Sequence, residues 1–172
     1  MIHLKLTMRI RTEFLLLIVV FLGCGQSALP PEAYVSEGRL PRFDDFPVRP
    51  TFSGRPLPVN LLSHPRALRF RDRLISGAKI GPNFAGHYTV VRLDCGTDCQ
   101  QPVILDARTG GVVMAPFSTQ VGFRIHLNSR LIIANPPEDL DRIRYPQRKF
   151  EFETGYYLWR GDRFLKLASV QY

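Results

Sequence analysis

The stretch GPNFAGHYTVVRLDCGTDCQQPVILDARTGGVVMAPF, residues 81–117, decides the fold of this chain. Its segment FAGHYTVVRL (84–93) is rich in aromatic and β-branched residues, which favour a strand. PVILDA (102–107), the turn sequence RTGG and the following VVMAPF together have the pattern of a β-hairpin. The stretch therefore predicts a strand, a short loop between Cys95 and Cys99, and a hairpin.

Two further pairs of strands are predicted after this stretch. VGFRIHL (121–127) is followed by RLIIAN (130–135), and FEFETGYYLW (150–159) is followed by FLKLASV (164–170). The polar sequence PPEDLDRIRYPQRK (136–149) between the two pairs indicates a long loop. Short strands joined by hairpin turns favour antiparallel pairing. We therefore expect an α+β, mostly β fold: an antiparallel β-meander of about six to seven strands with one packed N-terminal helix.

The helix is predicted to begin at Ser63, a favourable N-cap residue, with Pro65 in its first turn. Apolar residues recur at steps of three and four and predict a core-facing stripe: Ala67, Phe70, Leu74 and Ala78. Basic residues follow the same spacing on the outer side: Arg66, Arg69 and Arg73, joined by Arg71. This arginine face is either a solvated helix surface or a docking face for acidic or phosphate-rich partners.

The amino terminus predicts export. Basic residues precede the uninterrupted apolar stretch FLLLIVVFLG (14–23), which is too short to span a membrane and has the length of a signal-peptide core. The sequence FLGC, ending at Cys24, looks like a bacterial lipobox, although Leu22 stands where a small residue is usual. We expect a lipid on Cys24, which would tie the protein to a bacterial membrane; ordinary cleavage a few residues later is the alternative.

Three regions follow from this interpretation. Residues 1–23 form the signal peptide, residues 24–42 a flexible proline-rich tether, and residues 43–172 a single globular domain. Seven of the 14 prolines lie between residues 25 and 58, where they exclude a helix and favour extended backbone. The phenylalanines from Phe43 onward are too apolar for a linker, so we expect that part to lie against the domain.

The chain is basic. Its 172 residues carry a formal charge of +8, and removal of residues 1–23 leaves 20 basic against 14 acidic residues, or +6. An excess of this kind suits an anionic partner. For an exported chain we expect an anionic envelope polymer or an acidic protein, and no nucleic acid.

Cysteine usage agrees with an oxidising compartment. If Cys24 carries lipid, Cys95 and Cys99 remain as one pair, which predicts a disulfide closing the loop CGTDC. A metal or redox site is the alternative interpretation. A second ligand pair at usable spacing is missing, and the redox motif is CxxC rather than CxxxC.

His87 is a weak catalytic candidate. Strand alternation would place it on one face with Ala85, Thr89, Val91 and Leu93, where a structural histidine is the more common outcome. As a general base it would need an orienting carboxylate, for which Asp94 is the first candidate, followed by Asp98 and Asp106, and a nucleophile such as Ser118 or Thr119. A metal site built from His87, Asp94, Asp98 and His126 has no diagnostic spacing, so we predict no metal and no cofactor.

Several motifs together resemble a group of uncharacterised bacterial exported proteins. These share an FAGHY strand, a CG-x-x-C loop, a D-x-x-TG hairpin and a terminal Y-x-W strand, which here read FAGHY, CGTDC, DARTG and YLW. The resemblance covers roughly residue 43 to the carboxyl end and departs from the pattern at Leu93-Asp94, where the relatives often have an aromatic residue and Gly. It implies the fold and export, and it carries no activity.

We therefore expect an exported cell-envelope lipoprotein of the periplasm or envelope that acts by binding rather than by catalysis. One alternative is a hydrolase that uses His87 near the Cys95–Cys99 loop. The other is a secreted inhibitor of an acidic enzyme, because the basic charge of the chain argues against a basic target.

Overall fold

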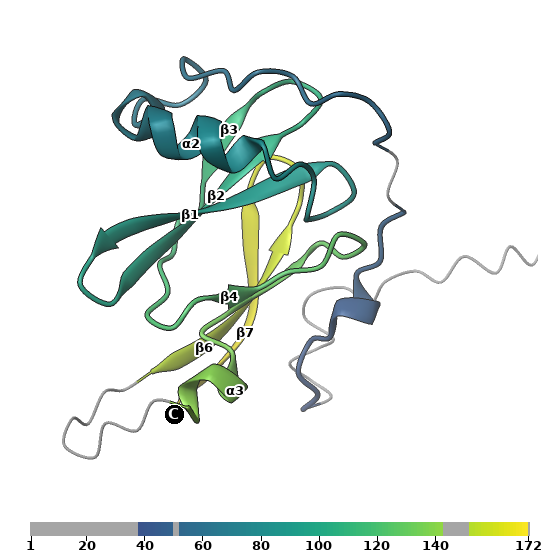
Figure 1. The fold of residues 1–172 in the computed structure, drawn as a ribbon. Helices are drawn as coiled ribbons and strands as arrows, with labels where there is room; N and C mark the ends of the chain where they lie inside the picture. Colours follow the sequence, from purple (N-terminus) through teal and green to yellow (C-terminus); the bar gives the residue numbers. More distant parts are fainter. Residues whose placement is uncertain (1–37, 50–51, 143–151, 172) are drawn as a thin grey trace, which may run out of the picture.

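The computed structural model describes residues 38–49, 52–142 and 152–171. In these residues the chain forms two antiparallel sheets and short helices (Figure 1). The first sheet has the order β1-β2-β3, with β1 Tyr88–Gly96, β2 Cys99–Asp106 and β3 Val112–Met114. The second has the order β4-β5-β6-β7, with β4 Phe123–Arg124, β5 Leu131–Ala134, β6 Glu153–Trp159 and β7 Phe164–Gln171. The helical elements are η1 Phe43–Asp45, η2 Ala67–Phe70, α2 Arg71–Ala78 and α3 Pro137–Leu140. The predicted α+β, mostly β fold is confirmed.

The helix covers one face of the first sheet (Figure 1). Ala67 and Leu74 are completely buried and pack on alternate residues of the strands, such as Val91 and Val103. Phe70 and Ala78 are partly buried against the same cluster, which confirms the predicted apolar stripe. The close approach is possible because Gly77 has no side chain: a Cβ there would lie 2.5 Å from a methyl group of Val91.

The opposite face of the first sheet packs on the second sheet. Val90 and Ile104 point to this side, and Ile132 and Trp159 meet them from β5 and β6. The Trp159 ring is 1% exposed and makes an edge contact with Tyr88, with ring centroids 5.4 Å apart. The molecule is therefore layered as helix, sheet and sheet, with strand alternation deciding which residues enter which core.

The proline-rich chain before the helix lies across both sheets, and we call its described residues 43–49 and 52–61 the strap. Phe46 packs on the far face of the second sheet, Val48 packs between the sheets, and Val59 packs under the helix. The backbone is hydrogen-bonded as well: Arg130 N–H donates to Phe46 O at 3.0 Å, and Leu57 N–H donates to Ala107 O at 2.9 Å. The strap thus contributes a side chain to each of the three apolar clusters.

The predicted helix start is wrong. Ser63 does not cap the helix, because its hydroxyl donates to Asn60 O at 2.6 Å and accepts the N–H of Val112 at 2.9 Å. The helical turns begin instead at Ala67 as a 3-10 segment and become α-helical at Arg71. The reason is that the edge strand β3 competes for the serine oxygen, which leaves Ser63 tied to the sheet.

The predicted strand over residues 84–93 begins four residues late, at Tyr88. Ala85 and Gly86 have positive φ values of 44° and 83° and form a tight turn, in which Tyr88 N–H donates to Phe84 O at 2.9 Å. Gly86 N–H donates to Leu127 O at 2.7 Å and fixes the turn to the loop before β5. His87 therefore lies in a turn, and the expected strand alternation does not apply to it.

The predicted loop at 136–149 contains a one-turn helix, α3, in its described part. Arg124 of β4 holds this helix through an ion pair with Asp139, with Nη1 and Oδ2 2.6 Å apart. The remainder of the loop, from residue 143, lies outside the described residues. Within the described ranges, no helix combines the length and apolar character needed to cross a bilayer.

Candidate functional site

The disulfide predicted between Cys95 and Cys99 is confirmed, with the two Cα atoms 5.0 Å apart. It closes the tip of the β1–β2 hairpin, where Gly96 pairs with Cys99. Asp98 occupies the turn at a φ of 51° and is exposed, as is Cys95. The tip is therefore a rigid, solvent-facing end of the first sheet.

The predicted arginine face is exposed, and its members make different contacts. Arg73 pairs with Asp94 of β1, with Nη2 and Oδ2 2.6 Å apart. The guanidinium of Arg69 lies 5.7 Å above the centre of the Phe70 ring. Arg69 and Arg71 are exposed and form no ion pair with a described residue, although Asp72 lies in the same helical turn.

A groove of about 520 Å³ lies between the start of η2, the disulfide and the end of β3. Its polar lining comes from His64, Arg66, Gln101 and Ser118. The apolar lining comes from the disulfide and from the chain that follows β3: Met114, Ala115, Pro116 and Phe117. No Asp or Glu is among the described residues that line it. The groove thus offers cationic and neutral donors without a carboxylate.

His87 has a carboxylate neighbour, but the neighbour is Asp106. Its Nε2 lies 3.7 Å from Asp106 Oδ1, slightly beyond hydrogen-bond range, and its ring lies 4.0 Å from the Tyr88 ring. Asp106 Oδ1 accepts the backbone N–H of Arg108 at 2.8 Å, as in an Asx turn. Burial lowers the pKa of His87, the positive charge of Arg108 lowers it further, and Asp106 opposes both.

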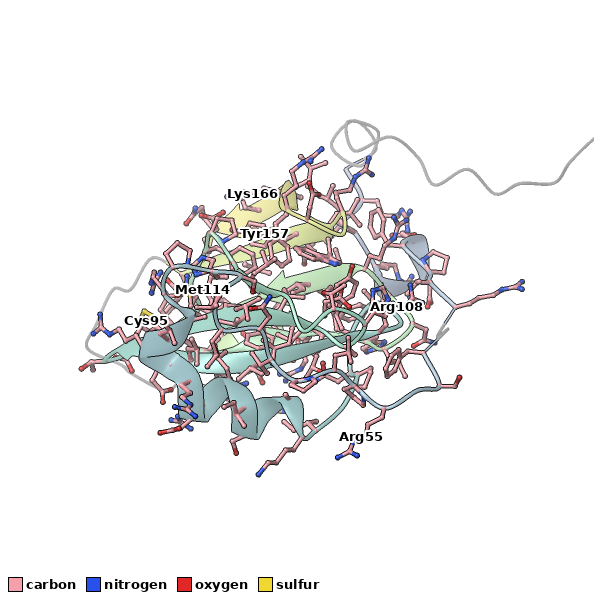
Figure 2. The ribbon with its side chains drawn as sticks, turned by 90° about the horizontal axis from the view of Figure 1, so that it is seen from above. Arg55, Cys95, Arg108, Met114, Tyr157 and Lys166 are labelled. Atoms are coloured by element: carbon pink, nitrogen blue, oxygen red, sulfur yellow. A yellow bond between two sulfur atoms is a disulfide. The ribbon has the colours of Figure 1, made fainter. Side chains whose placement is uncertain are left out.

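Asp94 does not meet His87, contrary to the sequence-based expectation. Tyr88 pairs with Asp106 at one end of the β1–β2 hairpin, and Gly96 pairs with Cys99 at the other. An extended strand rises about 3.3 Å per residue, which places Asp94 roughly 20 Å from His87. Figure 2 shows the same separation, with Cys95 and Arg108 on opposite sides of the molecule. The expected position of His87 near the disulfide loop is therefore wrong.

The four residues considered for a metal site also lie apart. His126 stacks on Phe43, with ring centroids 3.9 Å apart and planes at 9°, while Asp94 pairs with Arg73. Among the described residues, no group of three or more His, Cys, Asp and Glu side chains is placed to hold a metal ion.

The lowered pKa of His87 predicts a pH-dependent stability. The unfolded chain, in which histidine titrates near pH 6.5, takes up the proton before the folded protein does, so stability should fall as the pH drops from above 6.5 through the folded pKa. His87→Gln should remove this part of the dependence. The measurement is the free energy of unfolding by urea at pH 8 and pH 5 for both proteins. Identical losses in the two proteins would contradict the assignment.

Sequence spacing did not reveal the groove. Arg66 and Gln101, which form a hydrogen bond across it, are 35 positions apart, and His64 stood inside a predicted helix turn. The only available signal was the His64-Pro65-Arg66 sequence before the helix, which has no established meaning of its own.

Comparison with known proteins adds no further constraint: no family model, no curated protein and no solved structure matches this chain. The resemblance to exported bacterial proteins therefore stays a prediction. Cys24, the predicted lipidation site, lies outside the described residues together with the whole predicted signal peptide.

Proposed function

We propose that this chain is an exported envelope protein, held to a bacterial membrane by a lipid on Cys24, that binds an anionic envelope component. The binding surface is the arginine face of η2 and α2 together with the adjacent groove. The protein acts by binding, without catalysis.

The observation that carries this proposal is the arrangement of charge around the groove. Arg66, Arg69 and Arg71 are exposed on one short segment, and no Asp or Glu of the described residues lines the groove beside them. Among the described residues, Asp94 forms an ion pair with this face, through Arg73, and Asp72 is the acidic residue within α2 itself. Uncompensated cations on one surface attract polyanions and align them.

Neutralising part of the arginine face should weaken binding to a polyanion. An arginine near an anionic surface contributes roughly 1 kcal/mol, so Arg69→Gln with Arg71→Gln should lower affinity for polygalacturonate roughly 30-fold at low salt. The affinity of the parent protein should also fall as salt rises, because the charges are exposed. Binding isotherms measured from about 20 to about 300 mM NaCl, a range over which salt increasingly screens exposed charges, test both effects.

A matched control is the pair Arg160→Gln and Arg163→Gln. Both residues are exposed and lie in the β6–β7 turn of the second sheet, whereas the helix packs on the first sheet; Arg163 pairs with Asp162. The control removes the same two charges and should leave affinity within about threefold of the parent. An equal loss in both double variants would show that only total charge matters and would refute the proposed surface.

The hydrolase alternative would have to use His87 with Asp106 rather than with Asp94. The observation in its favour is the Asp106 carboxylate, whose Oδ1 lies 3.7 Å from His87 Nε2 and could orient the imidazole. A His87→Ala protein that folds and still performs every function of the parent would exclude this alternative.

A further inference from the structure

We propose that the groove is a built subsite for one acidic sugar or polyol phosphate unit, with Arg66 binding the oxyanion. This inference rests on the proposed function, because it specifies which chemical unit of the anionic partner binds in the groove beside the arginine face. A volume of about 520 Å³ is within the usual range of about 300–1,000 Å³ for small-molecule sites.

Arg66 is the member of the arginine face that lines the groove, and it is held there by hydrogen bonds. Its Nη2 donates to Gln101 Oε1 at 3.2 Å, and Gln101 Nε2 donates to Ala115 O at 2.8 Å. This chain of bonds ties the guanidinium to β2 and to the end of β3. Since a guanidinium has five N–H donors, four remain for an oxyanion after the bond to Gln101. Gln101 itself uses both ends of its amide and therefore acts by positioning Arg66.

His64 supplies a second donor. Its Nδ1 accepts the backbone N–H of Arg66 at 3.1 Å, so the proton of the neutral ring is on Nε2, which can donate. The Ser118 hydroxyl lines the same groove and can rotate to donate as well. Among the described lining residues, Arg66, His64 and Ser118 can thus all donate to a ligand, which matches an oxyanion and its neighbouring oxygens.

The rest of the groove lining is apolar. Met114, Pro116 and Phe117 form part of it, and Phe117 is fixed by stacking on Tyr157, with ring centroids 3.7 Å apart. Figure 2 shows Met114 on the same side of the molecule as Cys95. A groove that combines apolar lining with a few donors suits the carbon face of a ring or chain that carries an anion.

The geometry disfavours an extended peptide. β3 is an edge strand, and a peptide could pair with it only through outward-facing backbone groups. The N–H of Val112 is already bonded to Ser63, the N–H of Ala115 donates inward to Pro102 O, and Pro116 has no N–H. Too little edge remains to bind a strand, so a saccharide or polyol is the better occupant.

The test compares two arginines that carry the same charge. Trigalacturonate supplies the carboxylate form of the ligand and a glycerol phosphate trimer the phosphate form; maltotriose is the uncharged control. Arg66→Gln should weaken binding of at least one charged trimer roughly tenfold, whereas Arg69→Gln, whose residue is outside the groove lining, should weaken it less than threefold. The trimer that shows this difference identifies the oxyanion.

Gln101→Leu is a second variant that keeps the net charge. It frees Arg66 and should weaken binding of the same trimer several-fold, with the unfolding midpoint measured to verify folding.

Equal losses of affinity for Arg66→Gln and Arg69→Gln, or no binding of either charged trimer, would show that the groove is not a binding subsite. If a glutamate-rich peptide binds more tightly than either charged trimer, and this binding depends on Arg66, the ligand is an acidic peptide and not a sugar or polyol phosphate. If the groove fails while long polygalacturonate still binds through the arginine face, the proposed function stands; if that polymer does not bind, both fail.

Discussion

Gly110→Ala should destabilise the protein by about 3 kcal/mol or more. Gly110 ends the β2–β3 turn with a φ of 73°, and a Cβ on it would lie 2.1 Å from Pro58 O and 3.1 Å from Asn60 N. Both atoms belong to the strap, whose Asn60 N–H donates to Gly110 O at 2.8 Å. The methyl group therefore collides with backbone that cannot move without losing this bond, and urea unfolding measures the cost.

Gly81→Ala is the matched control. Gly81 has a similar φ of 77°, but nothing lies within 4 Å of the position of its Cβ. This variant carries the conformational strain without the collision and should lose only about 1 kcal/mol. Equal losses in the two variants would show that the strap does not press on the turn.

The Gly110→Ala variant also tests whether the strap positions a residue of the groove. Asn60 accepts at its carbonyl from the Ser63 hydroxyl, and Ser63 in turn accepts from Val112 of β3. His64 follows Ser63 directly and lines the groove. If Gly110→Ala displaces the strap at Asn60, it should also displace His64, so the folded fraction of this variant should bind acidic trimers more weakly than the Gly81→Ala protein.

Local sequence patterns predicted the hairpins because turn chemistry is local. RTGG contains the glycine that the positive φ at Gly110 requires, and the two cysteines of CGTDC are close enough in sequence to bond across a hairpin tip. The helix stripe was equally accessible, since Ala67 and Leu74 follow helical spacing on one apolar face.

Contacts between distant segments were not accessible in this way. The composition of residues 84–93 favoured a strand throughout, yet Gly86 bonds to Leu127 and bends the chain before Tyr88. This tertiary contact removed His87 from the strand. Asp94 was likewise expected to orient His87 because the two residues are near in sequence. An extended strand, however, separates residues by about 3.3 Å for each position. Periodicity reports which face is buried and says nothing about the segment that covers it.

Phe46→Ala should cost about 3–5 kcal/mol, the usual range for truncating a buried phenylalanine. Phe46 is 2% exposed and lies in one cluster with Leu131, Tyr156 and Leu158, on the face of the second sheet away from the first. The loss would leave a cavity under the strap, because the flanking backbone is held by the hydrogen bond from Arg130 and cannot collapse freely. Thermal and urea unfolding of the purified protein measure the change.

Leu40→Ala is the control from the same part of the chain. Leu40 is 42% exposed, and its truncation should cost no more than about 0.5 kcal/mol. A large loss at Phe46 with a small loss at Leu40 would mean that the cost comes from the buried ring and not from truncation of any apolar side chain in this segment. Equal small losses would mean that the strap is bound too weakly to support the second sheet. In that case the second sheet would have to hold together without residues 43–49 of the strap.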